Sequence, residues 1–498
     1  MTASWRARLR RLRFALFSAG AALVILLGVL AGLTQLAMPW LIHHPQHVEH
    51  WLSARLQRPV SIAHLSGRWV GGGPLLALDG VRIGTASTGQ STLAIPHAEL
   101  AFDLYALFRR NRAVSEFRLS GLELGLVDEA GGWHLRGLEF GSTGNAEQPF
   151  SLGALGALEI SDLTLDVVDA QRGLNLRLAA PVMRLLNRGA TTRVLARVRM
   201  ADAPESPPLD VVADLDLNAR SGDLYVGGRD IDLGRFAGGQ APAGIEFAAG
   251  HGAVQLWAHV DAARVDDVRL RVDLRDARFG AASPLEVDAG TVVAPRVGYD
   301  RLAFVARWLR DADGWTFDLA DFVAGSDAAA TPARLTVERR GDDARPRWRA
   351  GARAFPLQPP GDFAMLADAL PAGLRRWLYL AHPRGTLVQA EFAWNDAADY
   401  ELSGELRGIG FASADFAPGI GHLDLDLHGD AQALLLQLPR QPLRIDSPRI
   451  FRRPLAFAQF GGDVVVRRAE GAWNIATDRV GFEGEGYGGE LRGRLELR

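Results

Sequence analysis

The sequence predicts a mainly β protein, in which an N-terminal transmembrane helix is followed by an elongated antiparallel sheet with a few short helices. Three observations predict this fold. A long uncharged segment lies near the N-terminus, apolar and polar residues alternate with a period of two over much of the remaining chain, and Gly-rich turns separate the alternating runs. Alternation of this kind places apolar side chains on one face of a strand. Short turns between such runs indicate antiparallel hairpins rather than βαβ units.

The composition is that of a folded chain. Of the 498 residues, 48% are hydrophobic and 23% are charged, and Cys is absent. A disordered chain would have fewer apolar residues and a larger net charge. The absence of Cys excludes disulfides, thiolate metal sites and a Cys nucleophile.

The charge distribution argues against nucleic acid as a partner. Five Arg lie in the first 13 residues, which hold no acidic residue. Removing those five from the 55 basic residues leaves 50 against 58 acidic ones, a balance of −8 for the rest of the chain. A nucleic-acid-binding body would usually be basic.

The segment from Phe14 to Ile42 holds no charged residue. It is longer than the roughly 20 helical residues that cross a bilayer. It is also longer than the apolar region of a secretory signal peptide and lacks a good cleavage site, so we expect an uncleaved signal anchor. The preceding Arg residues predict a cytoplasmic N-terminus, with the rest of the chain after about residue 42 on the far side of the membrane.

A short amphipathic helix is expected directly after the anchor. Val48, Trp51, Leu52 and Leu56 fall on one helical face, and Pro59 ends the pattern. From there the period changes to two. Five alternating runs predict strands, and their apolar members are the candidate residues for an apolar groove: Leu100, Phe102 and Leu104; Leu163, Leu165 and Val167; Leu174, Leu176 and Leu178; Leu270, Val272 and Leu274; Leu423, Leu425 and Leu427.

Two further features are predicted between the strands, a pair of helices and a recurring turn followed by Trp. Residues 363–380 predict two short helices separated by Pro371. Turns followed by Trp recur at Trp133, Trp315 and Trp473, which indicates a weak repeat with an aromatic residue at the start of a return strand. We therefore expect a cytoplasmic tail at 1–13, the anchor at 14–42, the amphipathic helix at 43–58, a β-rich groove region at 59–360 and a second β-rich region at 361–498 that opens with the two helices.

No catalytic, cofactor or metal site is predicted. Gly484, Gly486 and Gly489 match a dinucleotide-binding pattern, but a strand rather than a helix is expected to follow them. The dense histidines at 43–50 lack a second ligand set with the spacing of a structural metal site, so we interpret them as a polar segment that caps the anchor.

A long sheet with one apolar face must keep that face from water. It can close on itself, pack on a second sheet, be covered by helices or bind apolar ligands. Few helices are predicted, so cover by helices is the least expected. An open curved sheet would form a groove for acyl chains, whereas a sandwich would show the same alternation, and periodicity alone leaves both open.

Several segments, in their order along the chain, resemble the YhdP branch of the AsmA-like family. The segments are Trp51–Ile62 followed by Leu65–Trp69, the strand–turn–strand unit Leu100–Leu126, Leu370–Leu378, and Ala417–Gly421. The resemblance runs over nearly the whole chain. Members of that branch are much longer than 498 residues, so we expect either a short relative or part of a longer protein.

The resemblance implies a function without catalytic residues or cofactors. It implies an inner-membrane anchor, a periplasmic β-groove that holds phospholipid acyl chains, and phospholipid transport between inner and outer membranes that contributes to outer-membrane integrity. Two alternatives remain at this point: an envelope scaffold that recruits an unidentified envelope protein, and an assembly factor for outer-membrane proteins.

Overall fold

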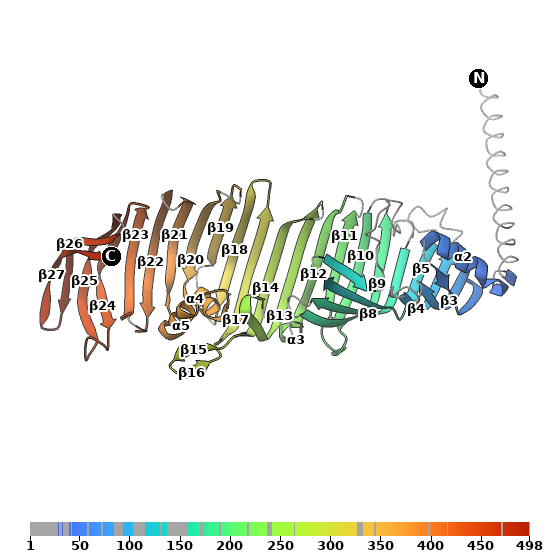
Figure 1. The fold of residues 1–498 in the computed structure, drawn as a ribbon, viewed down its shortest axis with the longest axis horizontal. Helices are drawn as coiled ribbons and strands as arrows, with labels where there is room; N and C mark the ends of the chain where they lie inside the picture. The colour runs from blue at the N-terminus through green and yellow to red at the C-terminus, as the bar shows by residue number, and fades with distance from the viewer. Residues whose placement is uncertain are drawn as a thin grey trace, which may run out of the picture. The chain divides into compact units, whose positions relative to one another are not determined.

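The structure is a computed structural model of the chain (Figure 1). It describes residues 28, 32, 39–40, 42–56, 59–70, 73–83, 93–102, 115–129, 132–136, 157–169, 174–188, 191–216, 219–236, 242–262, 264–325, 332–342, 345–396, 399–415, 417–469 and 472–497. Within these residues the chain is mainly β: 25 of the described strands belong to a mostly antiparallel sheet, and two more form a separate ribbon. It divides into two compact units, residues 1–170, 175–204 and 211–218 (unit 1) and residues 171–174, 205–210 and 219–498 (unit 2).

Unit 1 holds one described helix and the first strands. Its elements are α2 (Pro45–Leu56), β1 (Val60–Ser61), β2 (His64–Val70), β3 (Gly73–Ile83), β4 (Leu93–Phe102), β5 (Ser115–Ser120), β6 (Glu123–Glu129), β7 (Gly132–Arg136), β8 (Ala157–Asp169) and β10 (Thr191–Met200); β9 (Leu174–Arg188) and β11 (Leu209–Asp216) have residues in both units. Antiparallel pairs join β3 to β1, β2 and β4, and also join β4 to β5, β6 to β7 and β9 to β10.

Two pairs in unit 1 depart from the predicted antiparallel pattern, because β5 and β6 both run parallel to β8. Strand β5 pairs with the first part of β8 and β6 pairs with the second part. The two strands are separated at Gly121, whose φ of +73° favours glycine. The reason lies in the neighbouring hairpin. Since β7 takes the antiparallel place beside β6, β8 joins the other edge of β6 and runs in the parallel direction.

The predicted amphipathic helix is present as α2. Val48 is buried in the hydrophobic core of unit 1, and Leu52 packs against that core. Glu49 Oε1 accepts a hydrogen bond of 2.8 Å from the backbone N–H of Ile62, which fastens the helix to the chain beside β1. Trp51, predicted on the same apolar face, is instead 52% exposed.

Unit 2 is an antiparallel meander in which each main strand pairs with the next one along the chain. Its strands are β12 (Ser221–Asp232), β13 (Ile245–Asp261), β14 (Arg264–Ala281), β17 (Arg296–Arg310), β18 (Gly314–Ala324), β19 (Ala333–Arg340), β20 (Arg347–Pro356), β21 (Arg384–Asp396), β22 (Asp399–Phe411), β23 (Gly419–Asp430), β24 (Ala433–Asp446), β25 (Leu455–Ala469), β26 (Ala472–Gly484) and β27 (Tyr487–Leu497). The ribbon β15 (Leu285–Asp288) and β16 (Thr291–Val293) lies between β14 and β17 in sequence.

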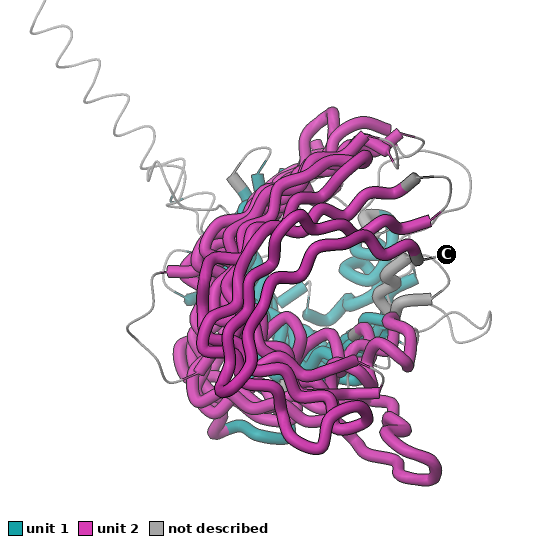
Figure 2. Tube along the Cα trace, turned by 90° about the vertical axis from the view of Figure 1, so that its left-hand side faces the viewer, with its two compact units in different colours: residues 1–170, 175–204, 211–218 teal, residues 171–174, 205–210, 219–498 magenta. Residues whose placement is uncertain are grey.

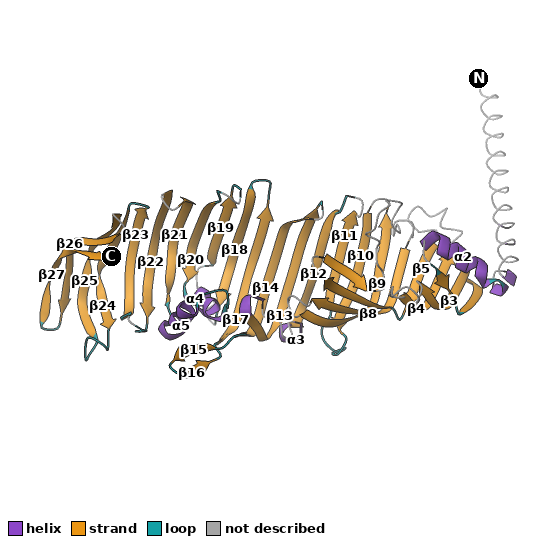
Figure 3. Cartoon of the chain, viewed as in Figure 1, coloured by secondary structure: helices purple, strands orange, loops and turns teal. Residues whose placement is uncertain are grey.

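Few helical segments accompany these strands (Figure 3). They are α3 (Leu233–Phe236), the 3₁₀ turn at Pro242–Gly244, α4 (Gln358–Leu366) and α5 (Ala372–Ala381). Prolines in the first turn of α4 suit a helix start, and α5 ends at His382, which has a left-handed conformation and precedes Pro383. These two helices confirm the pair predicted at 363–380.

The strands of unit 2 are strongly curved, and they bend around the side on which α4 and α5 lie (Figures 2 and 3). Met365 and Leu366 of α4 are buried against Val272 and Leu274 of β14 and Leu302 of β17. The helices therefore cover part of one sheet face. The sequence had made cover by helices the least expected outcome, because it did not show that two short helices would fold back onto the preceding strands.

The predicted boundary near residue 360 falls inside unit 2, since the compact units divide at residues 170–219. The helices at this position are an insertion between β20 and β21, and these two strands still pair directly. Residues 1–13 and nearly all of 14–42 lie outside the described residues. Among the helices that are described, none is long and apolar enough to span a bilayer.

Candidate functional site

Strand register in unit 2 brings apolar side chains into continuous rows on one face. Directly paired residues lie side by side on the same face of a sheet. The first row crosses twelve strands through Val226, Leu256, Leu270, Ala306, Leu319, Leu335, Ala352, Ala390, Gly404, Leu427, Leu436 and Val464.

A second row runs beside the first and reaches all fourteen main strands. It passes through Leu224, Ala258, Val268, Trp308, Phe317, Val337, Ala350, Phe392, Leu402, Gly429, Leu434, Val466, Ile475 and Leu495. Every member of both rows is apolar or glycine. We call the sheet face that carries these two rows the apolar face.

The side chains of the two rows are mostly only part-buried. Phe392 and Leu495 are 37% and 54% exposed, and Ala306, at 8% exposed, is the one buried member. On the same face and nearer α4, Val272 and Leu274 are only 7% and 2% exposed. The apolar face is therefore closed where the helices cover it and accessible along the two rows. Such accessible apolar rows on the inner side of a curved sheet can bind an apolar ligand.

The opposite face of the same strands is polar and charged. Arg307 Nη2 donates a 2.8 Å hydrogen bond to Asp267 Oδ2, and this interaction lowers the pKa of the Asp267 carboxyl below its ordinary value. Thr336 Oγ1 donates to Asp318 Oδ1 at 2.9 Å. Charged and polar side chains thus interact with one another on this face, so the two faces of the sheet differ in their affinity for water.

The predicted residues of β14 and β23 lie on the apolar face. Leu270 and Leu427 are both members of the first row. Leu425 pairs with Leu406 and Leu423 with Ile409, which extends the face toward the helices, while Val272 and Leu274 lie beneath α4. The sets predicted from two distant parts of the sequence are therefore brought onto one surface.

The predicted residues between 100 and 178 lie in different surroundings. Leu100 and Leu163 are buried in the core that also holds Val48 of α2, and Val167 is 9% exposed. Leu165, Leu176 and Leu178 are part-buried. Phe102 and Leu174 are strand residues whose side chains are not described, and Leu104 lies outside the described residues.

Sequence reasoning missed the small residues that complete the rows. Ala352, Ala390 and Gly404 lie side by side on β20, β21 and β22, and none belongs to a run of large alternating residues. Only the register identifies them as members of the first row. The recurring turn–Trp pattern was a real signal, because Trp315 and Trp473 both lie at strand starts on the apolar face.

The histidine segment of unit 1 is engaged in ring packing. The rings of Trp40 and His44 stack with centroids 5.0 Å apart, and His44 Nδ1 lies 2.9 Å from the Trp40 carbonyl oxygen. Within the part of the chain that the structure describes, no group of three or more His, Asp or Glu side chains is arranged to hold a metal ion.

Comparison with known proteins identifies the family. Searches of the curated proteins and of the solved structures found no match. The family model described as "YhdP protein" matches residues 1–497, which is nearly the whole chain. The chain therefore belongs to the YhdP family.

Proposed function

We propose that this chain is a lipid conduit, in which the apolar face of unit 2 serves as a groove for phospholipid acyl chains. The two continuous rows of part-buried apolar side chains are the observation that supports this proposal. Burial of a methylene group is worth about 0.8 kcal/mol, so an acyl chain gains substantially by leaving water for such a surface.

The rows also suit movement of a lipid. Adjacent strands lie about 4.8 Å apart, so a step from one strand to the next exchanges one set of apolar contacts for a similar set. Because Ala, Gly, Val and Leu recur along the rows, no single position binds an acyl chain much more tightly than its neighbours. A surface of nearly uniform affinity lets a ligand slide instead of trapping it.

The same proposal includes the location of the protein. Residues 14–42 anchor the chain in the inner membrane with a cytoplasmic N-terminus, and the body lies in the periplasm. The conduit then carries phospholipid between the inner and outer membranes and contributes to outer-membrane integrity. This function requires neither a catalytic residue nor a cofactor. The exposed Trp40 and Trp51 suit the membrane interface near the anchor.

Photo-crosslinking in cells tests this function. The full chain is expressed in a Gram-negative host with a photoreactive phenylalanine analogue at Leu402 on the second row. The matched control carries the analogue at Ser403, the next residue of β22, which faces the other side. We expect phospholipid adducts at position 402 and few at 403 by mass spectrometry. Absence of lipid at both positions would favour an envelope scaffold or an assembly factor.

A further inference from the structure

A third row borders the apolar face along one edge of the sheet. It comprises Arg310, Trp315, Arg339, Trp348, Trp394 and Tyr400, which pair directly from β17 to β22. Each residue lies two positions from a member of the second row and therefore points to the same face. We call this set the rim row.

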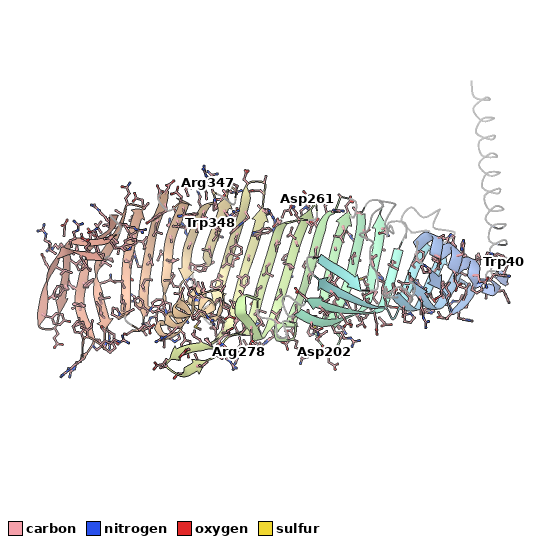
Figure 4. All side chains as sticks on the ribbon, in the orientation of Figure 1. Trp40, Asp202, Asp261, Arg278, Arg347 and Trp348 are labelled. Carbon is pink, nitrogen blue, oxygen red and sulfur yellow. The ribbon has the colours of Figure 1, made fainter. Side chains whose placement is uncertain are left out.

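The rim row lies at the hairpin ends of its strands. Trp315 is the second residue of β18, Trp348 is the second residue of β20, and Arg310 is the last residue of β17. Figure 4 shows Trp348 on the same long edge of unit 2 as Asp261, with Arg278 on the opposite edge. The helices α4 and α5 cover the apolar face on that opposite side, so the accessible rows lie between the helices and the rim row.

Two indole rings meet above the central strand of the rim row. Trp315 and Trp348 both pair with Arg339, and their ring centroids are 5.6 Å apart at an interplanar angle of 83°. Strands β18 and β20 are separated by β19 and thus by roughly 9.6 Å, so the two rings lean toward each other over β19. Arg339 Nη2 reaches outward, 3.5 Å from the Asp342 carbonyl oxygen in the hairpin.

The chemistry of these side chains fits the boundary between hydrocarbon and a charged headgroup. Trp and Tyr are amphipathic and gather where an apolar layer meets water. Arg binds phosphate through two parallel hydrogen bonds. The nearby carboxylate of Asp311 is already engaged by Arg340 of the polar face and by the backbone N–H of Asp313 at 2.9 Å.

The width of the apolar face also matches the length of a phospholipid acyl chain. Seven residue steps of β20 separate Trp348 from Phe355, and the positive φ of Ala354 (+49°) interrupts the alternation so that both lie on the apolar face. Phe355 is 6% exposed and stacks on Phe322 at the far side. Seven steps correspond to roughly 23 Å of strand. One leaflet of a bilayer contributes about 15 Å of hydrocarbon, so an acyl chain fits between the rim row and the covered end.

We propose that the rim row binds the phosphate headgroups of phospholipids whose acyl chains lie across the two apolar rows. This inference rests on the proposed lipid-conduit function and adds a fixed orientation to it. Each lipid lies along the strands, with its headgroup at the hairpin edge of β17–β22 and its chain ends toward α4 and α5. The headgroups then move along a row of arginine and aromatic side chains while they remain in contact with water.

Two photoreactive phosphatidylglycerol probes test the orientation with the full chain in maltoside micelles. One probe carries the reactive group in its headgroup and the other carries it at the end of an acyl chain. We expect the headgroup probe to label peptides that contain Trp315, Trp348 or Trp394. The acyl probe is expected to label the apolar rows and the strand segments near α4.

Arginine variants provide the matched comparison. Replacement of both Arg310→Gln and Arg339→Gln is expected to lower headgroup labelling about threefold or more, because the double variant removes two cations that can form charge-assisted hydrogen bonds with phosphate. Arg339→Lys keeps the charge and should retain most of the labelling. Arg347→Gln lies at the same edge but on the polar face, opposite Arg340, and should leave the labelling unchanged.

Three results would overturn the inference. The first is headgroup labelling at the α4 and α5 side, or labelling that the double variant leaves intact, while the acyl probe still labels the apolar rows. The second is loss of headgroup labelling in the presence of millimolar inorganic phosphate alone, which would indicate a site for free phosphate. The third is failure of the acyl probe to label the rows, which would overturn the lipid-conduit function as well.

Discussion

The guanidinium group of Arg375 lies 2.9 Å from the carboxylate of Asp368, and this pair fixes the two helices that cover part of the apolar face. Arg375 is 6% exposed. Its Nε donates to the Met365 carbonyl oxygen at 3.0 Å, and its Nη2 donates to the Ser283 carbonyl oxygen at 3.3 Å. One side chain of α5 therefore joins α4, the following loop and the segment before β15.

Loss of this arginine should loosen the helical cover. Arg375→Leu removes three polar contacts and leaves Asp368 without its cation, so we expect a destabilisation of about 2 kcal/mol. Protease cleavage between residues 357 and 383 should become faster. Arg376→Gln, which breaks a more exposed pair with Asp415, should cost about 0.5 kcal/mol and serves as the control. Equal effects in thermal unfolding of the two variants would contradict the assigned role of Arg375.

A second contact gives the attachment of α4 a dependence on pH. Tyr299 Oη donates a 2.9 Å hydrogen bond to Asp362 Oδ2, and burial raises the pKa of the Asp362 carboxyl above its usual value. The folded state therefore holds this proton more tightly than the unfolded state. The stabilisation from protonated Asp362 is complete below about pH 4 and is lost as the pH rises through the raised pKa.

Asp362→Asn should remove the loss of folding stability that accompanies deprotonation of Asp362. The amide oxygen of the new side chain can still accept the hydrogen bond from the Tyr299 hydroxyl. We expect the variant to unfold at a higher temperature than the natural protein at neutral pH, and this difference should vanish in acid. Tyr299→Phe instead removes a donor from a half-buried carboxylate and should cost about 1–2 kcal/mol at neutral pH. If the difference in unfolding temperature between the natural protein and Asp362→Asn were the same at every pH, Asp362 would be excluded as the titrating group.

The assignment of faces can be tested at two adjacent residues of β23. Leu427→Asp places a charge in the first row and should sharply reduce lipid adducts at neighbouring row positions, with a stability cost of about 1–2 kcal/mol for the lost apolar burial. His428→Asp changes the exposed residue on the polar face and should do neither. Asp424 is a poorer control, because its Oδ1 accepts a 2.7 Å hydrogen bond from the Gly408 N–H. Similar effects of Leu427→Asp and His428→Asp would refute the face assignment.

Gly404 offers a way to obstruct the first row without damage to the backbone. A Cβ atom at this position would lie 3.4–3.7 Å from Leu406, Leu427 and Ala390, which is ordinary contact distance. Gly404→Trp should therefore fold with a change in stability of about 1 kcal/mol or less, yet place an indole across the row. The host should become sensitive to large antibiotics that an intact outer membrane excludes.

The control for the obstruction is Ser403→Trp, which places the same side chain on the polar face. This variant should support normal outer-membrane integrity. Loss of integrity with Ser403→Trp alone, or normal integrity with Gly404→Trp in a stable protein, would argue against transport along the first row.

The sequence predicted the β class, the two helices and the apolar alternation because each depends on local periodicity. Leu270 and Leu427 could be identified as strand residues with apolar neighbours two positions away. That they belong to one row could not be predicted, since it depends on seven successive registers between β14 and β23 and on the β-bulges between them. The same limit hid Gly404 and Ala390, which carry no periodic signal.

The parallel pairs of unit 1 and the position of α4 could not be predicted from the sequence either. Leu124 and Leu165 are paired across β6 and β8, two strands joined in sequence by a long segment, and no local pattern fixes the direction of such a pair. Met365 lies beneath the curve of the sheet because Arg375 and Tyr299 hold the helices there. Contacts between residues so distant in sequence are decided by tertiary packing.

The proposed conduit requires the apolar face of unit 2 to be one continuous path for lipid. Its most direct test is a crosslinking scan of the full chain in cells, with a photoreactive residue placed in turn at Leu256, Leu335, Leu402 and Leu434, and at Glu391 on the polar face as the reference. We expect phospholipid adducts at all four row positions, few at Glu391, and loss of adducts on one side of β22 when Gly404→Trp is added. Adducts confined to one row position, or equally frequent at Glu391, would contradict it.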